Sequence, residues 1–205
     1  MHKLFYLFVF MVVALNAQTK LTSSEAEKLR AIVKEQAEKT RTITSDFTQY
    51  KHLDFLANDI ESKGKMAFKA PDMVKWEYAE PFAYSIIFKD QALYINDDGN
   101  KSNMDVGGNK IFEQLNHLIT ASIQGDMFDD DQFDISYFAK DERSIVHFSP
   151  KNSQLRDFIK AFHLTFNKSG EVESVKMIEP SGDYTRIVLG NRQTNQPLSD
   201  ADFVH

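Results

Sequence analysis

The stretch Ser62–Pro81 reads SKGKMAFKAPDMVKWEYAEP and predicts two strands joined by a tight turn. Alternation on both sides of Pro71 gives one face that carries Gly64, Met66, Phe68, Val74, Trp76 and Tyr78. Pro71 fixes its own φ and pushes Ala70 into an extended conformation, so the chain can reverse between Lys69 and Asp72 without starting a helix. Two short strands cannot cover this much apolar surface by themselves. Another part of the chain must therefore lie on that face.

Further strands are predicted on both sides of this hairpin. A segment rich in threonine and aromatic residues precedes it at 43–50. Alternating apolar patterns predict the others, at 84–89, 92–96, 101–106, 133–138, 144–149, 161–166, 172–179 and 184–189. Turns containing Gly170 and Gly182 separate the last three. About ten strands in meander order, with helices inserted, predict an α+β fold: one strongly curved antiparallel sheet with helices on its concave side.

Two helices are predicted. The first spans 24–40, where Ser24 and Glu27 have the spacing of a capping box. Its narrow apolar stripe consists of Leu29, Ile32, Val33 and Ala37. The second spans 110–125 and has helical spacing of Ile111, Leu115, Leu118, Ile119 and Ile123. Because it interrupts a series of strands, we expect the second helix to cross the sheet.

Residues 1–17 predict a secretory signal peptide. Lys3 precedes an apolar run from Leu4 to Leu15, and about a dozen apolar residues are fewer than the roughly 20 that span a bilayer. Cleavage is expected near Ala17, which leaves residues 18–205 as a single domain, soluble in the periplasm; an uncleaved anchor is the weaker alternative. The chain contains no cysteine, which excludes lipid attachment through cysteine, disulfides and thiolate metal sites.

Composition and motifs argue against several function classes. The formal net charge is -6 and there is no basic run, so nucleic acid is not an expected partner. The six histidines show no HExxH spacing, and GxSxG, P-loop and GxGxxG motifs are absent from the sequence. The acidic run at 126–134 lacks the glycine and glutamate of an EF-hand, which favours a solvated turn. His163 alternates with apolar neighbours and is expected to face solvent. We therefore predict no catalytic residue, metal or cofactor, with an unrecognised enzyme as the alternative.

An ordered set of motifs resembles the outer-membrane lipoprotein carrier family, LolA. It comprises Phe47-Thr48-Gln49, then Gly64, Pro71, Trp76, Tyr78 and Pro81, the two glycine turns, and the closing Asn195, Leu198 and Phe203. The similarity covers essentially the whole mature chain. It implies an incomplete β-barrel closed by an α-helical lid, which together enclose an apolar cavity for the acyl chains of a lipoprotein.

The resemblance also implies a function and partners. The expected role is a non-enzymatic periplasmic chaperone that carries acylated lipoproteins from the inner to the outer membrane. An inner-membrane lipoprotein-releasing ABC transporter complex would load it, and an outer-membrane receptor, where one exists, would accept the cargo. A carrier or sensor of another lipid on the same scaffold is the nearer alternative, and a hydrolase of envelope lipids is the farther one.

Strand alternation selects the residues expected at the site. The lipid-binding cavity is expected to be lined by Phe47, Met66, Phe68, Val74, Trp76, Tyr78, Ile86 and Phe88. The expected lid residues are Leu115, Leu118 and Ile119. A register slip of one residue would exchange the two faces of a strand. The family's lid-holding arginine is replaced here by Ala70, so we expect the lid to close by apolar packing and to open more easily.

Overall fold

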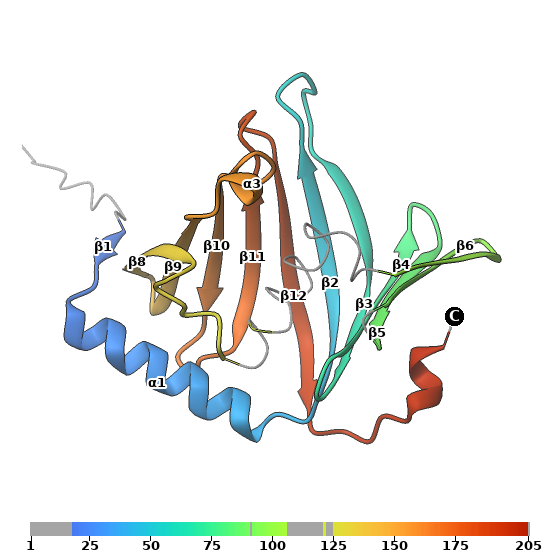
Figure 1. The fold of residues 1–205 in the computed structure, drawn as a ribbon, viewed down its shortest axis with the longest axis horizontal. Coiled ribbons are helices and arrows are strands. Elements are labelled where there is room, and N and C mark those ends of the chain that lie inside the picture. The colour runs from blue at the N-terminus through green and yellow to red at the C-terminus, as the bar shows by residue number, and fades with distance from the viewer. Residues whose placement is uncertain (1–17, 91, 106–120, 122–124, 205) are drawn as a thin grey trace, which may run out of the picture.

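The computed structural model describes residues 18–90, 92–105, 121 and 125–204. Within these residues one 12-stranded sheet has the order β1-β8-β9-β10-β11-β12-β2-β3-β4-β5-β6-β7, and every neighbouring pair is antiparallel (Figure 1). The strands are β1 (Thr19–Lys20), β2 (Thr42–His52), β3 (Ile60–Lys69), β4 (Met73–Glu80), β5 (Tyr84–Lys89), β6 (Ala92–Asp97), β7 (Asn100–Asp105), β8 (Phe133–Lys140), β9 (Arg143–Pro150), β10 (Ala161–Phe166), β11 (Val172–Ile178) and β12 (Tyr184–Thr194). The predicted large antiparallel sheet is confirmed.

The sheet consists of two meanders that meet at a long-range strand pair. Strands β2–β7 form one meander and β8–β12 the other, and they are joined because β12 pairs with β2 from Tyr184↔His52 to Thr194↔Ile43. In the part of the chain that the structure describes, the edge strands β1 and β7 do not pair with each other, so the curved sheet stays open (Figure 1).

The hairpin predicted from Ser62–Pro81 is confirmed as β3 and β4. Its register places three pairs on one face, namely Phe68↔Val74, Met66↔Trp76 and Gly64↔Tyr78. Directly opposed residues in an antiparallel pair share a face. The two alternating patterns of the sequence therefore combine into a single apolar surface.

Helix α1 (Ser23–Lys39) begins two residues earlier than its predicted cap implies. Thr22 is the N-cap: its backbone N–H donates to Glu25 Oε2 at 2.8 Å, and its hydroxyl accepts from the backbone N–H of Glu25 at 3.3 Å. The prediction of a Ser24–Glu27 capping box was therefore wrong. Both pairs have the same three-residue spacing, so the motif alone could not select one of them.

The buried stripe of α1 also differs from the predicted one. It consists of Ala26, Leu29 and Val33, whereas Ile32 is 41% exposed. The helix lies beneath the half of the sheet that contains β8–β12 (Figure 1). A Cβ at Gly170 would lie 3.1 Å from the Cα of Val33, so the helix backbone approaches the β10–β11 turn closely. Gly170 also has a positive φ, a conformation that glycine adopts readily in turns.

Arg30 fastens α1 to the sheet. Its guanidinium makes a bidentate ion pair with Asp130, at 2.8 and 2.9 Å, and its Nε donates to the hydroxyl of Tyr137 in β8 at 2.6 Å. The Asp130 carboxylate holds the pKa of Arg30 above its usual value, and Arg30 holds the pKa of Asp130 below its own. The first helix therefore has a specific anchor as well as an apolar face.

Several element boundaries differ from the predictions. Residues 53–59 connect β2 and β3, because β2 continues two residues past the strand predicted at 43–50 and β3 begins at Ile60, two residues before Ser62. Strand β12 continues five residues past Leu189, and two elements were not predicted, β1 and the 3-10 helix η2 (Asp200–Phe203). A short helix, α3 (Ser153–Arg156), lies between β9 and β10.

Some predictions fall on residues that the structure does not describe. The signal peptide at 1–17 lies outside the described residues, as do nearly all of the helix at 110–125 and the lid residues Leu115, Leu118 and Ile119.

Two apolar clusters cover the concave side of the sheet. One lies on β2–β6 and includes Ile43, Phe68 and Val74. The other lies between α1 and β8–β10 and includes Val33 and Phe166. Both clusters also contact residues of β11 or β12, where the two meanders join. The space between the clusters is where the two halves of the chain face each other.

Candidate functional site

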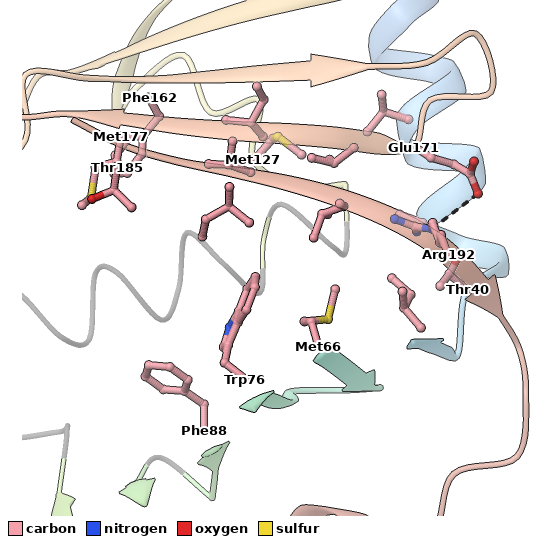
Figure 2. Close-up of a pocket in the computed structure, with 18 of the residues that line it drawn as sticks. Thr40, Met66, Trp76, Phe88, Met127, Phe162, Glu171, Met177, Thr185 and Arg192 are labelled. Carbon is pink, nitrogen blue, oxygen red and sulfur yellow. Dashed lines mark ion pairs between the residues drawn. The ribbon is translucent and has the colours of Figure 1, made fainter. Parts of the chain in front are cut away.

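An apolar cavity of about 370 Å³ lies between the two clusters (Figure 2). Its walls come from α1, from β2–β6 and from β9–β12, so it is built from both ends of the chain. Aromatic and methionine side chains contribute prominently, including Trp76, Phe88, Met66, Met127 and Met177 (Figure 2). A cavity of this size falls within the roughly 300–1,000 Å³ of small-molecule sites.

Five of the eight residues predicted for the cavity line it: Met66, Trp76, Tyr78, Ile86 and Phe88. The register explains this grouping, since Trp76 pairs with both Met66 and Ile86 across neighbouring strands. These side chains form the wall on the hairpin side.

The other three predicted residues lie in the core behind this wall. Phe68 and Val74 are only 1% and 0% exposed, and neither contributes to the cavity surface. Phe47 is 2% exposed and its ring packs edge-on against Trp76, with ring centroids 5.0 Å apart. Alternation assigned all eight to the correct face. It could not tell which side chains on that face reach the cavity and which support it.

Gly64 makes room for Phe47. A Cβ at position 64 would lie 2.7 Å from the Cζ of Phe47 and would also overlap the carbonyl oxygen of Glu77. Real side chains do not approach so closely, so only glycine fits beneath this ring. The glycine of the hairpin motif therefore has a packing role.

The opposite wall was not predicted. It consists mainly of residues from β9–β12: Phe148, Phe162, Leu164, Val175, Met177, Thr185, Ile187 and Leu189. Their alternation was visible in the sequence, because strands at 161–166, 172–179 and 184–189 were predicted. What the sequence did not reveal was the pairing of β12 with β2, which brings this wall opposite the hairpin.

Most polar groups at the cavity have partners within the protein. Tyr78 donates its hydroxyl to Gln49 Oε1 at 2.9 Å and stacks on Tyr84, with ring centroids 4.1 Å apart. Burial, reinforced by Tyr84, raises the pKa of Tyr78, so its hydroxyl stays neutral and remains a donor. Thr40 donates to the carbonyl oxygen of Gln36 at 2.7 Å. These groups leave the wall apolar in character.

Arg192 and Glu171 are the charged exceptions. Their closest atoms, Arg192 Nε and Glu171 Oε1, are 3.4 Å apart (Figure 2). The Nε of Arg192 is buried and has no hydrogen-bond partner among the described residues. Burial lowers the pKa of Arg192, and the nearby Glu171 charge opposes this effect. Glu171 Oε2 accepts a hydrogen bond of 2.9 Å from Asn167 Nδ2.

Two histidines lie outside the cavity lining, on the outer face of the sheet. His147 and His163 stack with ring centroids 3.5 Å apart, and they point away from the face that carries Phe162 and Leu164. His163 was predicted to face solvent; it lies on the outer face of β10, but its ring is only partly exposed because the ring of His147 stacks on it. Among the described residues, no group of three or more His, Asp or Glu side chains could hold a metal ion.

The site thus has the features of a binding cavity for an apolar chain. Burial of a ligand against aromatic and aliphatic walls drives such binding, and a few polar groups fix its orientation. No helix within the described ranges is both long enough and apolar enough to cross a membrane.

Comparison with known proteins agrees with this geometry. The model of the family "Outer membrane lipoprotein carrier protein LolA" matches residues 38–205. An outer-membrane lipoprotein carrier protein of Francisella tularensis subsp. novicida is 24% identical over 203 residues, which cover 99% of this chain and 92% of that protein.

Solved structures share the fold at low sequence identity. A DUF1329 family protein from Desulfovibrio piger has a TM-score of 0.51 and 12% identity. The match covers 87% of this chain and 97% of that chain. The Pseudomonas aeruginosa MucA/MucB complex contains a chain with a TM-score of 0.50 and 11% identity. The match covers 88% of this chain and 61% of that chain. Because the family model matches residues 38–205, which are most of this chain, the chain belongs to the outer membrane lipoprotein carrier (LolA) family.

Proposed function

We propose that the protein is a periplasmic carrier that shelters the acyl chains of lipoproteins on their way from the inner to the outer membrane. The observation that carries this proposal is the apolar cavity of about 370 Å³ between the two halves of the sheet. Membership of the lipoprotein carrier family and the carrier relative in Francisella support it.

The cavity volume sets the scale of binding. A methylene occupies roughly the 30 Å³ of a water molecule, so 370 Å³ accommodates on the order of ten methylenes. Each buried methylene contributes about 0.8 kcal/mol, which gives roughly 8 kcal/mol for one chain segment. That is enough to hold a chain and small enough to permit its release when a partner offers another apolar surface.

The composition of the walls suits a cavity that is alternately empty and loaded. Met66 on β3 and Met177 on β11 come from the two opposite walls. Methionine side chains are unbranched and flexible, so they fill irregular gaps and adapt to ligands. Trp76 offers a large flat surface next to them. Such walls can close on themselves and reopen around an acyl chain.

The remaining parts of the proposal concern export and partners. Residues 1–17 would direct the chain to the periplasm, and the helix at 110–125 would cover the cavity through Leu115, Leu118 and Ile119. An inner-membrane lipoprotein-releasing ABC transporter complex would load the carrier, and an outer-membrane receptor, where one exists, would accept the lipoprotein. We assign the protein no catalytic role.

Mass spectrometry of material that co-purifies with the full chain recovered from the periplasm tests the function. Intact acylated lipoprotein is the expected result. Free phospholipid without lipoprotein would refute the lipoprotein assignment and favour a carrier or sensor of another lipid. Lipid recovered as hydrolysis products would indicate a hydrolase instead.

A pair of substitutions on neighbouring positions of β12 tests the cavity itself. Ile187 lines the cavity, and Val188 points to the outer face and is 36% exposed. Ile187→Phe should fill part of the cavity and reduce the amount of co-purifying lipid, with little change in the urea midpoint. Val188→Phe adds the same ring outside and should leave lipid recovery unchanged. Equal recovery from both variants would contradict binding at this cavity.

A further inference from the structure

A β-bulge in β12 turns Arg192 into the cavity. Before the bulge, alternate residues of this strand line the cavity, namely Thr185, Ile187 and Leu189. Gly190 then pairs with Asp46 and Gln193 with Thr44, so Asn191 and Arg192 together stand opposite Ser45. Simple alternation would place residue 191 inside and residue 192 outside. The extra residue reverses this, and Arg192 joins the cavity lining.

The bulge is held by its own hydrogen bonds. Asn191 adopts a left-handed conformation, with φ of 50°, and its Nδ2 donates to Asp46 Oδ2 at 2.7 Å. The hydroxyl of Ser45 donates to the carbonyl oxygen of Gly190 at 2.7 Å. Bulges are commonly used to re-aim a side chain next to a functional site. Three side chains therefore maintain the irregularity that directs Arg192 inward.

Arg192 has donors left over for a ligand. Its side chain is 19% exposed, and its buried Nε makes no hydrogen bond to any described residue. A guanidinium carries five N–H donors in a fixed planar arrangement. Glu171 lies 3.4 Å from Nε and is itself bonded to Asn167, so it offsets the charge without satisfying the donor. Buried donors in native proteins normally have a partner.

The position of Arg192 within the cavity suits the head of a lipid. Figure 2 places Arg192 with Glu171 and Thr40 at one end, and Phe162, Met177 and Thr185 toward the other. An acyl chain lying along the apolar walls would therefore present its polar end to the guanidinium. Because the Glu171 carboxylate is adjacent, a neutral acceptor fits there better than a second anion.

We propose that Arg192 binds the ester or amide carbonyl oxygen at the head of an acyl chain whose tail occupies the cavity. This inference rests on the proposed function and specifies the ligand class of the same site. Arg192 would fix the depth and direction of the chain, while the walls supply the apolar contacts.

Two lipids that differ only in this carbonyl group test the proposal. 1-Monopalmitoylglycerol has an ester, and 1-O-hexadecylglycerol has an ether in its place. Their affinities can be measured by displacement of an apolar fluorescent dye from the wild-type protein. The wild type should bind the ester about tenfold more tightly, as expected for one hydrogen bond to a charged donor. Arg192→Met should remove this preference, so that the variant binds ester and ether with equal affinity.

Arg186→Met is the matched control. Arg186 lies on the same strand but on the outer face, where its guanidinium packs over Tyr50 at 4.7 Å, so its loss should preserve the ester preference. Equal wild-type affinities for ester and ether, or a preference that survives Arg192→Met, would overturn the proposal and leave the carrier function standing. If neither lipid displaces the dye, the acyl-chain cavity itself is refuted, and this inference with it.

Discussion

The stacked histidines on the outer face should make the protein lose stability in mild acid. His163 on β10 is paired with His147 on β9 and with Lys176 on β11. Burial, followed by the His147 and Lys176 charges, lowers the pKa of His163 to about 4. Burial also lowers the pKa of His147. Protonation of His163 would place a charge on a partly buried ring that already faces another imidazole and an ammonium group.

The sign and size of the effect follow from proton linkage. An unfolded histidine binds its proton near pH 6.5, whereas folded His163 does so near pH 4. Between these values the unfolded state binds more protons, so the free energy of unfolding falls as the pH falls. The whole difference corresponds to about 3 kcal/mol, of which about 2 kcal/mol is lost between pH 7.5 and pH 5.

Urea unfolding of the wild type and of His163→Gln at pH 7.5 and pH 5 measures this contribution. The wild type should lose about 2 kcal/mol more than the variant over this interval. Carboxyl groups with a lowered pKa, such as Asp130, change protonation below this pH interval. They are present in both proteins, so they do not contribute to the difference between them. Equal losses in the two proteins would refute the reasoning, as would an NMR titration that places the pKa of His163 above 6.

Three further predictions concern packing, anchoring and the binding signal. Gly64→Ala should lower the free energy of unfolding, measured with urea, by about 3 kcal/mol, because the added Cβ would overlap the Glu77 carbonyl oxygen. Gly190→Ala is the control: a Cβ at position 190 has no atom within 4 Å, so this substitution should be nearly neutral in the same assay. Arg30→Met should cost about 1 kcal/mol, since its bidentate ion pair is partly exposed, and hydrogen exchange in α1 should increase. Trp76 is the single tryptophan and lines the cavity, so lipid binding should shift its emission to shorter wavelength; an unchanged spectrum at saturation would place the lipid elsewhere.

The sequence predicted the strands well because strand signals are local. Met66 and Phe68, followed by Trp76 and Tyr78, alternate within a few residues, and this period directly encodes which side chains share a face. The segments at 84–89 and 161–166 were predicted with their observed bounds for the same reason. Turn residues separate these patterns clearly, so the ends of most strands were also predicted within a few residues.

Predictions failed where two local motifs fitted the sequence equally well, and where contacts between distant segments determine the structure. Thr22 and Ser24 both precede a glutamate by three residues, and in the structure Thr22 is the cap. The pairing of β12 with β2 joins segments about 140 residues apart, as in Ile187↔Gln49, and no local pattern reports it. Half of the cavity wall depends on that pairing.

Arg192 shows where alternation fails in the candidate site. A strict two-residue period through β12 assigns Arg192 to the outer face, and only the two-for-one pairing opposite Ser45 corrects this. Irregular pairing breaks the same rule that locates the rest of the cavity. Arg192 therefore lines the cavity although strict alternation would place it outside.

Positions 70 and 192 bear on how this chain departs from its family: the first lacks the family's arginine, and the second has an arginine that lines the cavity. The resemblance would place an arginine at the β3–β4 turn, but the residue there is Ala70, whose backbone N–H donates to the carbonyl oxygen of Arg41 at 2.8 Å. Thr40 borders both the hollow beside Ala70 and the cavity that Arg192 lines. Among the described residues, the guanidinium that lines the cavity together with Thr40 is that of Arg192, which comes from the bulge of β12. Because Arg192 lines the cavity and Ala70 lines only the neighbouring hollow, we expect that adding Ala70→Arg to the Arg192→Met variant will not restore the ester preference in the dye-displacement assay.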